Sequence, residues 1–98
     1  MGSAEIEIVR HDRVTHGDYI AQLADVDGTA KLSWTMRDGV RHAEHTFVPP
    51  AARGRNIAAK LVEALVSDAR SEGFKIAPDC SYVARYFDRH KDLADLRA

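Results

Sequence analysis

The stretch from His45 to Leu65 constrains the fold most, because it changes from a strand pattern to a helix pattern across two prolines. Pro49 and Pro50 lack an N–H donor and cannot continue a sheet ladder, so the strand is predicted to end by Val48. The apolar residues that follow recur at helical spacing: Ile57, Ala58, Leu61, Val62, Leu65, Val66 and Ala69. This strand–loop–helix unit indicates a fold that mixes strands and helices.

The loop inside this unit, Arg53-Gly54-Arg55-Asn56, has the composition of an anion site. The first N–H groups of a helix have no intrahelical acceptor, and the helix dipole places positive charge behind them. A helix N-terminus is therefore a ready site for phosphate, and two arginines add charge and donors. An ordinary polar loop of the same composition is the alternative interpretation.

The rest of the chain alternates between strand patterns and turn signals. The predicted strands cover residues 5–9, 19–24, 29–36, 40–48 and 74–77. Asp-Gly pairs at Asp27-Gly28 and Asp38-Gly39 indicate hairpins, so the first four strands should form an antiparallel meander. Residues 10–18 are predicted to be a polar connection. A helix over 56–72 joins the fourth strand to the fifth, which predicts that these two strands are parallel.

A second helix is predicted to begin after Pro78, with Asp79 or Ser81 as its N-cap. Its predicted apolar face is Tyr82, Val83, Tyr86 and Phe87. Residues 92–98 read as a short frayed tail. The predicted fold class is α+β: a mixed, mostly antiparallel five-stranded sheet with two main helices, forming one domain over residues 1–98.

Composition narrows the classes of function. A net charge of −1 gives no bulk attraction for nucleic acid or an anionic membrane, and no apolar run is long enough to span a bilayer. One cysteine among 98 residues excludes an internal disulfide and favours a reducing, cytoplasmic setting. The histidines show no metal-ligand spacing, so no metal is expected. We expect a monomer or a weak homodimer.

The run R-G-R-N-I-A resembles the acetyl-coenzyme A signature of the GNAT superfamily of N-acetyltransferases, Arg/Gln-x-x-Gly-x-Gly/Ala. Arg53 matches its first position, Ala58 its last, and Asn56 stands where the signature has its first glycine. Asparagine tolerates the left-handed conformation, so the loop can keep its shape. Together with the later motif P-x-C-x-Y-V, the resemblance covers roughly residues 5–91. Over this range the chain is similar to a small subfamily of single-domain proteins with a minimal GNAT-like fold.

The resemblance implies acetyl-coenzyme A as the cofactor and an amine as the acceptor, either a small molecule or a protein lysine or N-terminus. The residues it implies for the pyrophosphate are Arg53, Gly54, Arg55, Asn56, Ile57 and Ala58. Phe47 and Val48 would pair with the pantetheine arm through their backbone. His90, with Arg89 and Lys91, would either meet the 3′-phosphate or only cap the helix with positive charge.

Cys80 is the first candidate for chemistry. It precedes a helix start, which favours the thiolate, although a carboxylate at Asp79 is expected to raise the pKa of the thiol. In the resembled family the acetyl thioester lies between two splayed strands, and Cys80 is predicted to lie at that gap. It would accept an acetyl group transiently, or else it is a buried small hydrophobe.

Two further residues complete the predicted catalytic set. His45 is predicted to share the apolar face of its strand with Ala43 and Phe47, as a base or as a hydrogen-bonded structural residue. Tyr86 matches a tyrosine that, in many enzymes of the resembled family, protonates the departing thiolate; core packing is the alternative.

Three functions are compatible with these residues. The first is an acetyl-coenzyme A-dependent N-acetyltransferase, acting directly or through Cys80. The second is a non-catalytic acyl-coenzyme A binding module, because the helices that cover the acceptor in larger relatives are missing here. The third is an interaction domain that binds neither. The missing helices also predict an acceptor side that is open or completed by a partner.

Overall fold

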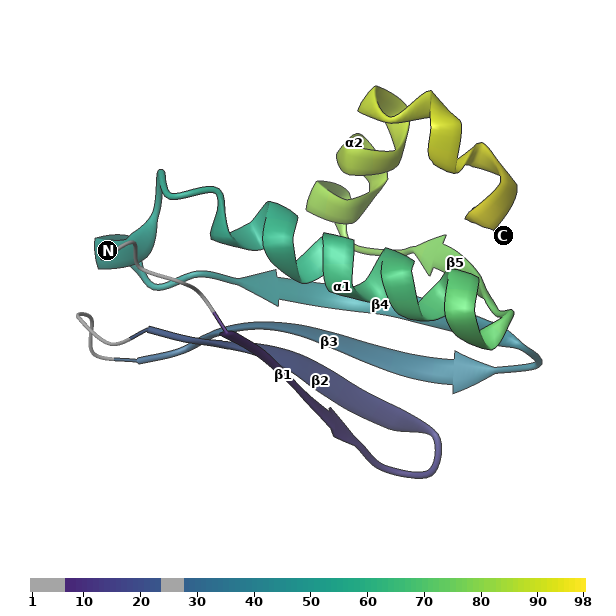
Figure 1. Cartoon of the computed structure of the whole chain (residues 1–98), viewed down its shortest axis with the longest axis horizontal. Helices are drawn as coiled ribbons and strands as arrows, with labels where there is room; N and C mark the ends of the chain where they lie inside the picture. The colour runs from purple at the N-terminus through teal and green to yellow at the C-terminus, as the bar shows by residue number, and fades with distance from the viewer. Residues whose placement is uncertain (1–6, 24–27) are drawn as a thin grey trace.

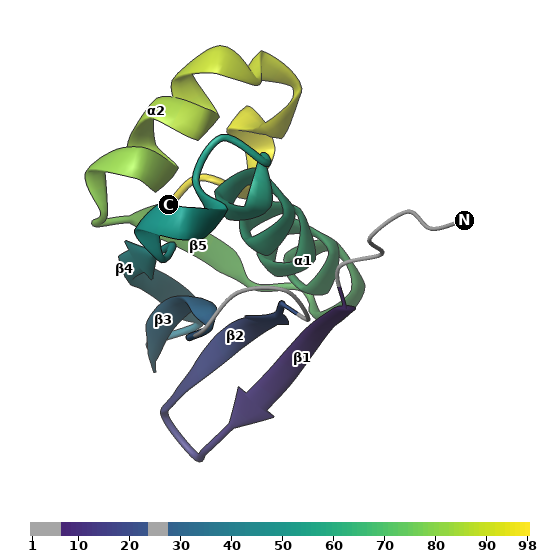
Figure 2. The ribbon, with the colours of Figure 1, turned by 90° about the vertical axis from the view of Figure 1, so that its left-hand side faces the viewer.

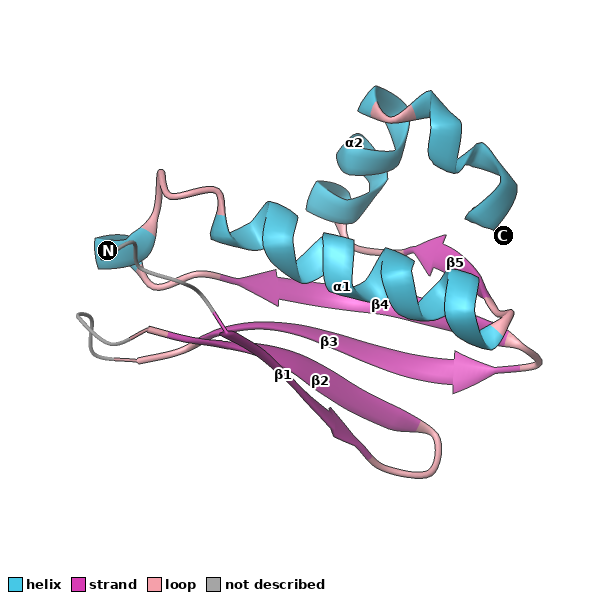
Figure 3. Cartoon of the chain, viewed as in Figure 1, coloured by secondary structure: helices cyan, strands magenta, loops and turns pink. Residues whose placement is uncertain are grey.

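The computed structural model describes residues 7–23 and 28–98 and shows a five-stranded sheet with its helices on one face (Figures 1 and 2). The strands are β1 (Glu7–Asp12), β2 (His16–Gln22), β3 (Ala30–Arg37), β4 (Val40–Phe47) and β5 (Lys75–Pro78). The helices are α1 (Ile57–Glu72), α2 (Ser81–Arg89) and the short 3₁₀ helices η1 (Pro50–Ala52) and η2 (Lys91–Leu96). Strands β1 to β4 pair antiparallel in chain order, and β4 pairs parallel with β5 (Figure 3). The predicted α+β class, strand order and parallel pair are confirmed.

Local signals placed the central elements correctly. Asp38 and Gly39 both have positive φ (53° and 78°), as a type I′ hairpin requires. Alternation in β3 buries Ala30, Leu32 and Trp34 beneath α1. The helix α1 ends where Gly73, at φ 80°, donates its N–H to the Ala69 carbonyl. The hairpin predicted at Asp27-Gly28 falls largely on residues 24–27, which lie outside the described residues.

The prediction that residues 10–18 form a connection is wrong. β1 continues to Asp12 and β2 begins at His16, so only residues 13–15 form the turn. The pairs Arg10↔Tyr19 and His11↔Asp18 lie within the ladder. Their polar side chains are typical of a loop in the sequence, and the carboxylates that pair with Arg10 from α1 lie 58 and 62 residues further along the chain.

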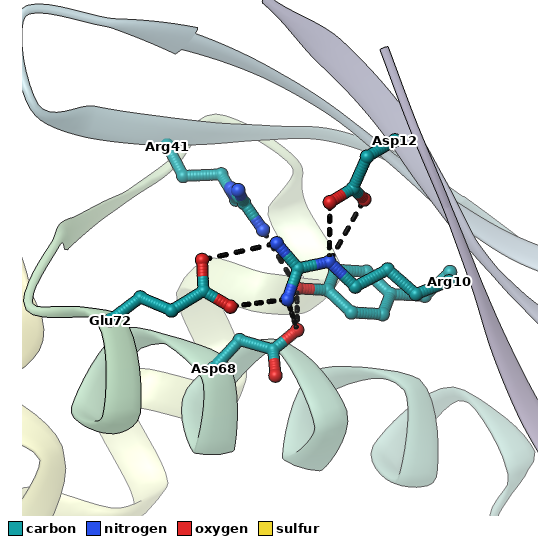
Figure 4. Close-up of polar contacts among 6 residues, drawn as sticks. Arg10, Asp12, Arg41, Asp68 and Glu72 are labelled. Carbon is teal, nitrogen blue, oxygen red and sulfur yellow. Dashed lines mark hydrogen bonds and ion pairs between the residues drawn. The ribbon is translucent and has the colours of Figure 1, made fainter. Parts of the chain in front are cut away.

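Arg10 is the centre of an ion-pair network that ties the edge strand β1 to α1 (Figure 4). Its guanidinium donates to Asp12, to Asp68 Oδ2 at 2.8 Å and to both carboxylate oxygens of Glu72. The hydrogen bonds to Glu72 and Asp12 raise the pKa of Arg10, and the bond to Arg10 lowers the pKa of Glu72. The network holds β1 in place despite its polar sequence.

Arg41 extends this network into the core. It is 3% exposed, and its guanidinium lies 3.6 Å from the Trp34 ring centroid and 4.2 Å from that of Phe74. Arg41 Nη1 donates to the Tyr19 hydroxyl at 2.9 Å, and that hydroxyl donates to Asp68 at 2.7 Å. The buried charge is thus compensated by two aromatic faces and a relayed carboxylate.

The main core lies between the sheet and α1, closed at one end by α2 and η2. Its largest fully buried side chains are Tyr19, Leu32, Ile57, Leu61, Val62, Leu65, Ile76 and Val83. The prediction of a frayed tail is wrong, since Leu93 and Leu96 of η2 are buried and the Ala98 N–H donates to the Ile76 carbonyl at 2.7 Å. The tail's two leucines are three residues apart, which suits one turn of 3₁₀ helix.

The helices can also be compared with the length and hydropathy that a membrane span needs. Within residues 7–23 and 28–98, none of the helices is long and apolar enough to cross a bilayer.

Candidate functional site

The loop that joins β4 to α1 presents unused amide groups. After η1 the chain passes through Gly54 at φ 86° and Asn56 at φ 63°, and α1 begins at Ile57. The Asn56 side chain makes no capping hydrogen bond, so the first-turn N–H groups of α1 stay available. Asn56 thus adopts, at the position where the signature has a glycine, the left-handed conformation that asparagine was expected to tolerate. The loop therefore has the geometry of an anion site.

Two cavities flank this helix start and share Asn56 and Tyr82. The smaller, about 250 Å³, is lined by Val48, Ala52, Arg53, Gly54, Asn56, Ile57, Ala58 and Tyr82. The larger, about 390 Å³, is lined by Asn56, Ala59, Glu63, Tyr82, Arg85, Tyr86, Arg89 and His90. Together they run from the end of β4, past the N-terminus of α1, to side chains of α1 and α2 that face a common space. Most of the residues predicted to bind the cofactor are thus brought together.

Phe47 and Arg55 are the predicted cofactor residues that line neither cavity. Phe47 ends β4 and is 50% exposed. Arg55 is exposed in the loop. The Val48 carbonyl already accepts a hydrogen bond from Arg53 Nε at 3.1 Å, which fixes the arginine against the end of the strand.

Tyr86 and His90 form a stacked pair at the far end of the larger cavity. Their ring centroids are 4.0 Å apart, and His90 Nδ1 donates to the Tyr86 carbonyl at 2.8 Å. Burial and the nearby charge of Glu63 raise the pKa of Tyr86, so its hydroxyl stays protonated near neutral pH. Arg85 and Arg89, one helical turn apart, supply positive charge beside this pair.

Cys80 occupies the N-cap of α2, so the predicted N-caps Asp79 and Ser81 are both wrong. Its N–H donates to the Ala43 carbonyl at 2.9 Å, and its thiol donates to Thr46 Oγ1 at 3.5 Å. Burial opposes ionisation, but the Thr46 hydroxyl and backbone groups at the start of α2 outweigh it and lower the pKa of the thiol. At a given pH the Cys80 thiol is therefore ionised to a larger extent than an unperturbed cysteine.

Asp79 does not act on the thiol as the sequence predicted. Its carboxylate accepts a hydrogen bond from His42 Nδ1 at 2.9 Å. The expected rise in the pKa of Cys80 is therefore wrong in its direction.

A β-bulge in β4 changes the face on which His45 lies. Ser33 pairs with His45 whereas Trp34 pairs with Ala43, so Glu44 is the extra residue. Trp34 and Ala43 are buried, while His45 is exposed on the opposite face. The predicted grouping of His45 with Ala43 is wrong, because strict alternation fails at a bulge. Thr46, which follows the bulge, is the β4 side chain that reaches Cys80.

The bulge coincides with the end of the β4–β5 ladder. The last pair is Ala43↔Pro78, and the chain then turns through Cys80 into α2 while β4 continues to Phe47. The two strands therefore separate beside the thiol, as predicted. Cys80 and Tyr86 lie about 9 Å apart along the axis of α2, from six residues at the helical rise. The predicted catalytic residues are therefore not gathered at one point.

Three cavity-lining residues were not predicted as site residues: Glu63, Arg85 and Tyr82, which lines both cavities. Arg85 had a usable signal, since it lies four residues from Arg89 and shares a helix face with it. Among the residues that the structure describes, no group of three or more His, Cys, Asp or Glu side chains could hold a metal ion.

The chain is a small α+β protein in which a left-handed loop and unpaired helix amides lie between the end of a strand and a helix N-terminus. A family model described as GCN5-related N-acetyl-transferase matches residues 18–96. The chain therefore belongs to the GCN5-related N-acetyltransferase family, in a minimal five-stranded form. Membership supports acyl transfer as the general class of activity.

Proposed function

We propose that the protein is an acetyl-coenzyme A-dependent N-acetyltransferase that acts on a primary amine of a small molecule or of a protein. The observation that carries the proposal is the pair of cavities that meet at Asn56, at the start of α1. One contains free helix amides, and the other contains arginine side chains and stacked aromatic rings. A ligand with a diphosphate in its middle and a phosphorylated nucleoside at one end suits this arrangement.

The proposed cofactor contacts follow the two cavities. The Arg53 N–H donates to the Pro50 carbonyl, so the backbone N–H groups from Gly54 to Ala58, with the side chains of Arg53 and Arg55 beside them, would hold the pyrophosphate. Arg89 and His90 would meet the 3′-phosphate, and the backbone of Phe47 and Val48 would pair with the pantetheine arm. This direction brings the acetyl group toward the point where β4 and β5 separate beside Cys80.

The proposed chemistry is nucleophilic attack on the thioester carbonyl. In the direct route the amine attacks and an imidazole of β4, predicted from the sequence as His45, takes its proton. In the covalent route Cys80 is acetylated first and the amine then displaces it. The lowered pKa of Cys80 supports the covalent route. Tyr86 would protonate the departing thiolate only if that sulfur came to the larger cavity, since the tyrosine lies there.

The alternative, a non-catalytic acyl-coenzyme A binding module, is favoured by a specific observation. The cavity-lining residues do not include Cys80 or His45, so the phosphate site can exist without a functioning acceptor site. Turnover with any amine, or an acetyl adduct on the protein, distinguishes the enzyme from the module.

Acetyl-coenzyme A is expected to bind and to raise thermal stability. A ligand present at 100 times its Kd stabilises the folded state by about 2.7 kcal/mol. Arg89→Ala should weaken binding of coenzyme A, with a smaller effect on 3′-dephospho-coenzyme A, because the 3′-phosphate is its proposed partner. Isothermal titration calorimetry and thermal unfolding measure both. The matched control is Arg70→Ala, at the other end of α1 where Arg70 pairs with Asp95. No binding at millimolar ligand would contradict the proposal.

The backbone at Asn56 gives a second expected result. At φ 63°, Asn56→Gly should be tolerated and should bind acetyl-coenzyme A at least as tightly, because the glycine leaves more room near the pyrophosphate. Asn56→Val should cost about 1–2 kcal/mol, because a β-branched residue resists the left-handed region. Calorimetry and urea unfolding compare the three proteins. Equal affinities would place the cofactor away from this loop.

A further inference from the structure

The helix-free face of the sheet carries two rows of polar side chains, each of which ends at a histidine of β4. One row pairs His11, Asp18, Ser33 and His45 across β1 to β4. The other pairs His16, Thr35 and His42. The buried Trp34 lies between Ser33 and Thr35 in β3, so both rows point away from α1. Among the described elements, no helix packs over this face (Figure 2).

His42 has a defined orientation on this face. Its side chain is 22% exposed, and Nδ1 lies 2.9 Å from Asp79 Oδ2. A carboxylate oxygen only accepts, so Nδ1 carries the proton and neutral His42 keeps a free lone pair on Nε2. His45 makes no hydrogen bond to the part of the chain that the structure describes, so nothing there fixes its ring.

The His42–Asp79 pair lies beside the last paired residues of β4 and β5. His42 pairs with Ala77, the next residue Ala43 pairs with Pro78, and the Ala43 carbonyl accepts from the Cys80 N–H. The pair thus stands on the open face of the same separation that holds the Cys80 thiol against Thr46 on the helix side. The imidazole and the thiol thus lie on opposite faces of the sheet at the same strand separation.

We propose that His42, oriented by Asp79, is the base that takes the proton of a protonated primary amine entering from the helix-free face. This role rests on the proposed N-acetyltransferase function. His42 would be the catalytic residue and Asp79 a positioning residue. The carboxylate of Asp79 also compensates the imidazolium that forms when His42 takes the proton.

In the direct route the amine attacks the thioester of acetyl-coenzyme A itself. His42 Nε2 takes one proton from R–NH₃⁺, and the freed nitrogen lone pair forms a bond to the acetyl carbonyl carbon. The carbon–sulfur bond then breaks and its electron pair leaves on sulfur. The second proton lost by the nitrogen neutralises that thiolate, which gives the amide, coenzyme A and protonated His42. In the covalent route the same proton transfer precedes attack on S-acetyl Cys80.

Other ionisable side chains near His42 come from each neighbouring strand and from the β5–α2 junction. Glu44 and His45 follow on β4, and Glu44 accepts a hydrogen bond from Thr35 at 3.0 Å. His16 lies in the same row on β2, and Asp79 comes from the β5–α2 junction. The carboxylates of Glu44 and Asp79 favour an ammonium group at this point, in agreement with a cationic acceptor.

The test compares His42→Gln, Asp79→Asn and His45→Gln, with His16→Gln as the control on the same face. Each protein is first checked for thermal unfolding and for acetyl-coenzyme A binding, neither of which the role should change. Initial rates with acetyl-coenzyme A are then measured from pH 5.5 to 8.5. The acceptor probes are Nα-acetyl-lysine methylamide, spermidine, a peptide with a free N-terminus and an aminoglycoside.

We expect His42→Gln to lower kcat about 100-fold with KM nearly unchanged and to lose the rise of kcat/KM with pH, as removal of a general base does. Asp79→Asn should lower kcat about tenfold and keep that rise. His16→Gln should match the wild type. Equal rates for His42→Gln and wild type, or a larger loss in His45→Gln, would overturn the role of His42. A wild type that binds acetyl-coenzyme A but acetylates none of the probes would overturn the enzymatic function and this role with it.

Discussion

Gly17→Ala is expected to destabilise the protein by about 3 kcal/mol, because overpacking a site closed by backbone lies at the upper end of such costs. A β-carbon at residue 17 would lie 2.5 Å from the His11 carbonyl oxygen and 2.6 Å from Cζ2 of Trp34. Neither neighbour can move freely. His11 is held in the β1 ladder, and Trp34 is buried with Arg41 over its ring. The unfolded state offsets roughly 0.4–1 kcal/mol of the loss.

Urea unfolding and calorimetry measure this effect. A loss of about 3 kcal/mol in a domain of this size lowers Tm by roughly 12 °C or more. The control is Gly39→Ala, which has no atom within 4 Å of its new β-carbon but sits at φ 78°. It should cost only about 1–2 kcal/mol, from the left-handed backbone alone. A Gly17→Ala protein as stable as Gly39→Ala would show that Trp34 is not packed as the structure has it.

Much of the fold could be predicted because its signals are local. The alternation of β3, the Asp38-Gly39 turn and the stripe of α1 each lie within a few residues. The β1–β2 hairpin could not be predicted in this way. Arg10 and Asp68 are 58 residues apart in the chain, and only their contact in three dimensions makes Arg10 a strand residue. Propensity yields to such tertiary contacts.

In the candidate site, too, features set by neighbouring residues could be predicted and features set by distant residues could not. The left-handed Asn56 followed from a position that requires an unusual φ and from the resemblance of one short loop. The face on which His45 lies could not be predicted, because the sequence alternates on both sides of the bulge and does not show where the extra residue is inserted. The His42–Asp79 contact joins two elements across 37 residues of sequence, so no local spacing pattern could predict this contact.

Cys80→Ser is expected to abolish an acetyl adduct that the wild-type protein forms. If Cys80 is the nucleophile, incubation with acetyl-coenzyme A should add one acetyl group, visible by intact mass and removed by hydroxylamine as a thioester. Serine lacks a thiolate and has no activating base in contact, so the variant should remain unmodified. The variant should fold, because serine is a favourable N-cap and Cys80 occupies that position in α2.

Thr46→Val is expected to slow acetylation of Cys80 without abolishing it. The Thr46 hydroxyl is the leading group that lowers the pKa of Cys80, so its loss should raise that pKa and reduce the thiolate present at neutral pH. Acetylation of Thr46→Val should therefore be slower at pH 7 and recover as the pH rises, whereas Cys80→Ser should stay unmodified at every pH. Coenzyme A binding should persist in both variants, because the phosphate contacts lie around α1. Full turnover by a stable Cys80→Ser protein would eliminate the covalent route and leave direct transfer, with an imidazole of β4 as the proton acceptor.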